Sequence, residues 1–196
     1  MNLPNKLTLT RVIMVPFFVA FLLLTPKFLY FKWIALGIFI VASLTDLLDG
    51  KIARKYNLVT NFGKFMDPLA DKLLVCSALI GMSSLGVIPA WITIIIIARE
   101  FIISGFRLIA AEKGVVIAAS MWGKWKTTFQ MVMLCVKMVV MNYYFEPYII
   151  GIKIIPLNVS IVMLVGNVTM YIALVLTVVS LIDYLVKNKD VLKDVD

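Results

Sequence analysis

The sequence has 196 residues, of which 62% are hydrophobic and 15% charged, with a formal net charge of +8. Soluble domains are usually about 45–50% apolar, so this excess indicates an integral membrane protein. Histidine is absent from the sequence, which excludes a histidine general base, a Ser-His-Asp triad and an imidazole metal ligand. Any metal site must then use oxygen ligands, which favour hard cations such as Mg²⁺ or Mn²⁺.

The apolar runs have the length that a membrane helix requires, about 20 residues for a hydrocarbon core of ~30 Å. The polar, basic start MNLPNKLTLTR leads into the apolar run Val12–Leu24 and predicts a short interfacial helix that continues into a first span. Five further spans are predicted, at Phe31 to about Lys55, Asn61 to about Ser84, Pro89 to about Lys113, Met121 to about Tyr144 and Ile155 to about Lys187. We therefore expect an all-α polytopic membrane protein with six transmembrane helices and a single domain over residues 1–196.

Lysine and arginine are distributed unevenly between the predicted loops. With the N-terminus in the cytoplasm, only Lys27, Lys32 and Lys153 fall on the outer side, so the positive-inside rule predicts that both termini face the cytoplasm of an inner membrane. The basic residues on the inner side suit lipid headgroups or phosphorylated substrates. A nucleic-acid partner is not expected, because these charges lie among spans and form no exposed basic face.

An acidic segment, DLLDGKIARKYNLVTNFGKFMDPLAD, covers residues 46–71 and holds four of the eleven acids of the chain. At 100° per residue, Asp46 and Asp49 share one helix face with two small residues, Gly50 and Ala53. Small side chains beside the acids would let a bulky ligand approach the backbone. This combination predicts a ligand site at the cytoplasmic end of the second helix.

The third predicted helix carries a matching stripe, because Gly63, Asp67 and Asp71 recur at positions i, i+4 and i+8. Four close carboxylates repel one another in a low dielectric, and a pair of divalent metal ions would neutralise them and bind phosphate oxygens. Two other interpretations stay open at this point. The acids could be solvated at helix ends, or they could line the pathway of a cation or proton transporter.

The spacing of these residues resembles a known signature. The segment reads D-x-x-D-G-x-x-A-R from Asp46 and, after eight residues, G-x-x-x-D-x-x-x-D from Gly63. This pattern resembles that of the CDP-alcohol phosphotransferase family at every defined position. The resemblance implies six transmembrane helices, a cytoplasmic site with two Mg²⁺ or Mn²⁺ ions, in-line displacement of CMP from a CDP-linked lipid, and a homodimer.

The resemblance also implies a role for each residue of the pattern. Asp71 would be the catalytic base. The metal ligands would be Asp46, Asp49, Asp67 and Asp71. The residues that bind the CDP donor would be Gly50, Ala53, Arg54 and Gly63.

The later spans carry basic residues that need an anionic partner. We expect Arg99, Arg107, Lys124 and Lys126 to bind the phosphate of a phosphorylated acceptor. The runs IAREFIISGFR, SMWGKWKTTFQ and PNKLTLTRVIMVP resemble the members of the family that transfer the phosphatidyl group of CDP-diacylglycerol to sn-glycerol 3-phosphate. Inositol phosphate, serine and a second phospholipid stay open as acceptors, as do a structural Arg99–Glu100 ion pair and plain membrane anchoring by the two lysines.

Overall fold

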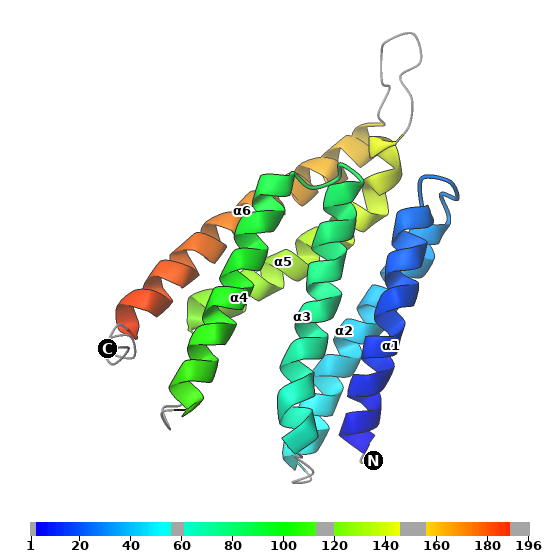
Figure 1. Ribbon diagram of the computed structural model, residues 1–196. Coiled ribbons are helices and arrows are strands. Elements are labelled where there is room, and N and C mark those ends of the chain that lie inside the picture. Colours follow the sequence, from blue (N-terminus) through cyan, green and yellow to red (C-terminus); the bar gives the residue numbers. More distant parts are fainter. Residues whose placement is uncertain (1–2, 56–60, 113–119, 146–155, 189–196) are drawn as a thin grey trace. The chain divides into compact units, whose positions relative to one another are not determined.

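The computed structural model describes residues 3–55, 61–112, 120–145 and 156–188. In this part of the chain all regular structure is helical and no strand occurs (Figure 1). The helices are α1 (Leu3–Leu24), α2 (Phe31–Lys55), α3 (Asn61–Ser84), α4 (Ala90–Glu112), α5 (Met121–Val140), the 3-10 helix η1 (Met141–Tyr144) and α6 (Leu157–Lys187). The all-α prediction is therefore confirmed.

The chain divides into two compact units. The first comprises Met1–Ile88 and Met138–Ile154, and the second comprises Pro89–Lys137 and Ile155–Asp196. Helices α1, α2, α3 and η1 thus belong to the first unit, whereas α4, most of α5 and α6 belong to the second. The single domain expected over residues 1–196 stays a prediction.

The first unit is built around α1, which packs against both α2 and α3 (Figure 1). Phe18 of α1 and Phe39 of α2 are fully buried, and their ring centroids lie 5.7 Å apart. Gly81 of α3 faces Leu22 of α1, and a Cβ atom on Gly81 would lie only 2.7 Å from the Leu22 Cδ2 atom. A glycine therefore lets these two helices approach closely, as small residues do in membrane helix pairs.

Two local contacts stabilise helix ends in this unit. At the end of α3 the Val87 N–H donates to the Met82 carbonyl at 2.9 Å, and Gly86 adopts φ 72°. This is a Schellman motif, and its left-handed position requires glycine. At the start of α2 the buried Lys32 ammonium donates to the Val139 carbonyl at 2.8 Å, which joins α2 to the last turn of α5.

The second unit contains the packed pair α4 and α6. The buried face of α6 consists mostly of small or hydroxyl-bearing residues at three- and four-residue spacing: Gly166, Thr169, Met170, Ala173, Thr177, Ser180 and Tyr184. Thr177 donates to the Ala173 carbonyl at 2.6 Å, and Thr169 donates to the Val165 carbonyl at 2.8 Å. These bonds satisfy the hydroxyls within their own helix. The buried face of α6 can therefore pack against apolar side chains, which cannot accept a hydrogen bond.

Apolar side chains cover much of the outer surface of both units, as expected for a lipid environment. Within the described residues, two helices are long and apolar enough to cross a membrane, Lys6–Leu24 with mean hydropathy 2.3 and Leu157–Lys187 with 2.2. The number of six spans therefore stays a prediction. The polar start and the apolar run form one helix, α1, so the interfacial location of its first turns also stays a prediction.

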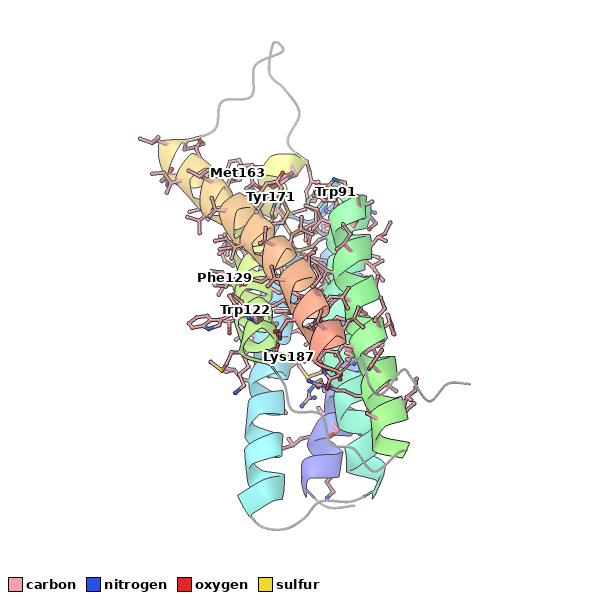
Figure 2. The ribbon with its side chains drawn as sticks, turned by 90° about the vertical axis from the view of Figure 1, so that its left-hand side faces the viewer. Trp91, Trp122, Phe129, Met163, Tyr171 and Lys187 are labelled. Atoms are coloured by element: carbon pink, nitrogen blue, oxygen red, sulfur yellow. The ribbon has the colours of Figure 1, made fainter. Side chains whose placement is uncertain are left out.

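Tryptophans lie at the helix starts of the second unit. Trp91 in the first turn of α4 and Trp122 in the first turn of α5 are about half exposed, with 52% and 47% of their surface accessible. Figure 2 shows the Trp122 ring projecting away from the helices. Such positions are typical of the aromatic belt at a membrane interface.

Candidate active site

The residues of the acidic pattern lie on two helices of the first unit. Asp46 and Asp49 belong to the second half of α2, and Asp67 and Asp71 belong to the first half of α3. Helices α2 and α3 contact each other and share α1 as a packing partner. Both segments are therefore helical, as the predicted grouping of these residues on helix faces requires.

The side chains of this pattern lie outside the described residues. They are Asp46, Asp49, Gly50, Ala53, Arg54, Gly63, Asp67 and Asp71. Among the described side chains no group of three acids, cysteines or histidines could hold a metal ion, and the predicted ligands are not among these side chains. The donor set itself fits a hard divalent cation, because it consists of carboxylates on two contacting helices.

The second unit places two of the predicted acceptor-binding residues together. The Glu100 Oε1 atom accepts from the Lys126 ammonium of α5 and lies 3.5 Å from the Arg99 Nη1 atom. Lys126 is 1% exposed and Arg99 is 9% exposed. Among the described side chains this cluster contains two cations and one carboxylate, an excess of positive charge that suits an anionic ligand better than a neutral one.

The other two predicted acceptor-binding residues are exposed. Arg107 lies on α4 two turns beyond Arg99, and Lys124 lies two residues before Lys126 on α5. Residues two apart on a helix face different directions, so Lys124 does not share the buried face of Lys126. The structure thus joins Arg99 to Lys126 through Glu100 and does not bring Lys124 into this cluster.

Sequence reasoning missed Ser180 as a partner of this cluster. The Arg99 Nε atom donates to the Ser180 Oγ atom at 3.2 Å, which fixes the guanidinium between α4 and α6. The residue pair is separated by 81 positions in the chain. The only sequence signal is the row of small and hydroxyl-bearing residues on α6, which indicates a packed face but does not identify its partner.

Two further polar residues of α5 are buried. Lys137 is 2% exposed and donates to the Asn167 Oδ1 atom of α6 at 2.8 Å. Gln130, one turn after Lys126, is also 2% exposed, and both of its side-chain polar atoms lack a hydrogen bond to any described residue. Helix α5 thus buries three polar side chains, Lys126, Gln130 and Lys137, among apolar ones such as Met133 and Leu134.

Comparison with known proteins supplies the family. The model of the CDP-alcohol phosphatidyltransferase family matches residues 1–179. The chain belongs to this family. Together with the apolar helices, this membership makes the protein an integral membrane protein.

Full-length relatives carry a more specific name. The chain is 41% identical to a CDP-diacylglycerol–glycerol-3-phosphate 3-phosphatidyltransferase of Bacillus subtilis (strain 168), over 98% of this chain and 97% of that protein. It is 40% identical to a protein of the same name from Haemophilus influenzae, over 98% and 96%. A Rickettsia bellii protein of that name is 36% identical over 91% of both chains.

Proposed function

We propose that the protein is a membrane enzyme that transfers the phosphatidyl group of CDP-diacylglycerol to sn-glycerol 3-phosphate, giving phosphatidylglycerophosphate and CMP. The observation that carries this proposal is the identity of 41% and 40%, over nearly the whole chain, to two proteins that bear the name of this activity. The acidic pattern of residues 46–71 supports the same reaction, since it combines carboxylates with small residues on adjoining helices.

In this proposal the acidic helices bind the donor. Asp46, Asp49, Asp67 and Asp71 would hold two Mg²⁺ or Mn²⁺ ions, which would neutralise charge on the donor diphosphate. Gly50, Ala53 and Gly63 would leave room for the CDP moiety, and Arg54 would donate to its diphosphate.

Asp71 would act as the general base. It would take the proton from the primary hydroxyl of the acceptor, whose oxygen attacks the phosphorus of the phosphatidyl group. The bond from this phosphorus to the CMP oxygen breaks as the new ester bond forms, and CMP leaves with its own phosphate. An in-line displacement of this kind needs no protein nucleophile.

The basic residues of the second unit would bind the phosphate of the acceptor. Arg99 and Lys126 support this role through their burial and the net positive charge that they share with Glu100. Arg107 and Lys124 would add charge from exposed positions. A cluster of this charge favours a phosphorylated acceptor over serine, because a buried cation is stabilised most by an anionic partner.

The membrane and assembly belong to the proposal as well. Both termini and the active site would face the cytoplasm of the inner membrane, because this orientation keeps nearly all lysines and arginines inside. The protein would work as a homodimer among membrane lipids, in line with the family resemblance.

The proposal is tested by CMP release from purified protein in detergent with Mg²⁺ or Mn²⁺, CDP-diacylglycerol and a panel of acceptors. The panel contains sn-glycerol 3-phosphate, inositol phosphate, serine and phosphatidylglycerol. We expect CMP with glycerol 3-phosphate at a rate far above the others. Turnover with another acceptor, and none with glycerol 3-phosphate, would disprove the assignment of the acceptor. Ion transport in proteoliposomes without CMP release would disprove the enzymatic function.

A further inference from the structure

Arg11 of α1 is an arginine buried in the first unit. It is 1% exposed, and Thr8, one turn earlier, is fully buried. Further along the same face of α1 the buried side chains are apolar, with Val15, Phe18 and Leu22. The core of the first unit therefore changes from apolar to polar in the half of α1 that contains its N-terminus. A guanidinium in such a place needs a counter-charge, because burial removes its hydration.

The backbone of Arg11 lies level with that of Asp46 of α2. The rings of Phe18 and Phe39, with centroids 5.7 Å apart, mark a point where α1 and α2 meet. Arg11 precedes Phe18 by seven residues, and Asp46 follows Phe39 by seven. The two helices run in opposite directions (Figure 1). Both steps therefore lead about 10 Å toward the end of the unit at which α1 begins.

The same comparison places Arg11 level with Asp71 of α3. A Cβ atom on Gly81 would lie 2.7 Å from the Leu22 Cδ2 atom, so these two residues mark a point where α1 and α3 meet. Arg11 precedes Leu22 by eleven residues, and Asp71 precedes Gly81 by ten. Helices α1 and α3 run in the same direction (Figure 1). The backbone positions of Arg11 and Asp71 thus differ by only about 1.5 Å along the helix axes.

Few acids of the first unit could balance Arg11. The residues assigned to this unit contain five acids: Asp46, Asp49, Asp67, Asp71 and Glu146. Glu146 lies outside the described residues, and it follows η1 in the chain. The residue Val139 just before η1 accepts from Lys32 at the start of α2, whereas the aspartates of α2 are near its other end. In this unit the acids at or within one helical turn of the level of Arg11 are therefore the four aspartates.

We infer that the Arg11 guanidinium is the counter-charge of the acidic site, and that it positions the carboxylates of Asp46 and Asp71 before a divalent cation binds. The inference rests on the proposed function, of which the cation site is a part, and it assigns a role to a residue outside the acidic pattern. One guanidinium cannot neutralise four carboxylates, so the site still attracts divalent cations. Arg11 and the cations compete for the same carboxylates, and Arg11 also repels the cations.

The test is Arg11→Met, which keeps a long apolar side chain and removes the charge. In EDTA this change should lower the melting temperature by about 5–10 °C, as for loss of one partner of a buried ion pair. With a fixed high concentration of Mg²⁺, the rise in melting temperature should exceed that of the wild type by about 3 °C or more, which corresponds to about tenfold tighter binding. The matched control is Lys6→Met, at an exposed position of α1, and it should behave as the wild type does.

A second substitution tests the coupling to the aspartates. Asp46→Asn relieves repulsion among the acids, and this relief is larger once Arg11 is absent. Asp46→Asn should therefore raise the melting temperature in EDTA by more in the Arg11→Met background than in the wild-type background. Arg11→Lys, which keeps the charge, should be destabilised less than Arg11→Met. If Arg11→Met alone yields no folded protein, its recovery by the added Asp46→Asn would support the inference, and continued failure would overturn it.

Two further results would overturn the inference. One is a Mg²⁺-dependent rise in Arg11→Met that equals or falls below that of the wild type, which would mean that Arg11 only packs between the helices. The other is an equal effect of Asp46→Asn in the two backgrounds, which would mean that Arg11 is not coupled to the acids.

These measurements separate the inference from the proposed function, because they follow unfolding and need no turnover. A larger Mg²⁺ response in Arg11→Met, in a protein that releases no CMP with glycerol 3-phosphate, would support the counter-charge and disprove the proposed function. CMP release with equal Mg²⁺ responses in both proteins would support the proposed function and overturn the inference on Arg11.

Discussion

In the cluster of Glu100, Arg99 and Lys126, loss of the negative charge and loss of a positive charge should change protein stability by different amounts. Glu100→Gln removes the carboxylate charge that faces both cations, so Lys126, which is 1% exposed, keeps a buried charge beside a neutral amide. Lys126→Met removes an ammonium and leaves Glu100 with Arg99 at 3.5 Å. We therefore expect Glu100→Gln to destabilise the protein more than Lys126→Met does.

The structure sets the scale of this difference. Removing one partner of a fully buried ion pair costs roughly 3–5 kcal/mol. The amide in Glu100→Gln can still accept a hydrogen bond, although this bond is about half as strong as one to the carboxylate. We therefore expect Glu100→Gln to lower the free energy of unfolding by only about 2 kcal/mol. Lys126→Met should cost about 1 kcal/mol or less because an apolar chain of similar volume replaces it. The double variant should fall about 1 kcal/mol short of the sum, since the two residues share one interaction.

Unfolding of the detergent-solubilised protein by denaturant, followed by tryptophan fluorescence, would measure these values. The control is Lys187→Met, which breaks the Asp183–Lys187 pair at a lysine that is 66% exposed, and it should change the free energy of unfolding by less than about 0.5 kcal/mol. A cost of Lys126→Met equal to or above that of Glu100→Gln would refute the reasoning, as would strictly additive effects.

Three other changes test the packing of α1 against α3, the buried Lys137 of α5 and the metal requirement. Gly81→Val should destabilise the protein by about 1–3 kcal/mol because the valine side chain would overlap Leu22. The control is Gly37→Val, which should cost under about 1 kcal/mol because a Cβ atom there meets nothing within 4 Å. Equal melting temperatures of the two variants would contradict this. Asn167→Leu removes one acceptor of the buried Lys137 ammonium and should lower the free energy of unfolding by about 1–3 kcal/mol in the same assay. An unchanged free energy of unfolding would contradict a stabilising role for this bond. Dialysis against EDTA should abolish CMP release, and Mg²⁺ or Mn²⁺ should restore it; full activity after dialysis would contradict metal dependence.

Much of the helix pattern is predictable because it follows from apolar run length and breaker residues. The expected ends of the second and third helices coincide with those of α2 and α3, as far as Lys55 and Ser84. The differences have local causes. Helix α6 begins at Leu157, after Pro156 at its N-cap, and not at Ile155. The fifth expected helix continues to Tyr144, but its last four residues form a 3-10 turn.

The pairing of side chains could not be predicted in the same way. Lys126 and Glu100 are 26 residues apart, and Arg99 and Ser180 are 81 apart, so their contacts depend on helix packing and not on local spacing. A basic residue near a helix end fits both a membrane anchor and a ligand-binding group by sequence alone. Burial argues against a membrane anchor for Lys126, which is enclosed, whereas Lys124 is exposed; the role of each in ligand binding stays a prediction.

The family, in contrast to the side-chain pairs, could be predicted from the sequence, because it depends on the fixed spacing of residues along the chain. The order of Asp46, Asp49, Asp67 and Asp71 led to the family before any contact was considered, and the match over residues 1–179 confirms the family. The roles of these four residues stay predictions, since their side chains lie outside the described part of the chain.

The most direct test of the central claim follows labelled sn-glycerol 3-phosphate into lipid. Purified protein with CDP-diacylglycerol and a divalent metal should form labelled phosphatidylglycerophosphate and an equal amount of CMP. Asp71→Asn should lower the rate about 10²–10⁴-fold through loss of the general base, while Asp183→Asn, outside the acidic pattern, should leave it within a few fold. Label that stays in the aqueous phase, or an Asp71→Asn variant with a near-normal rate, would contradict the account.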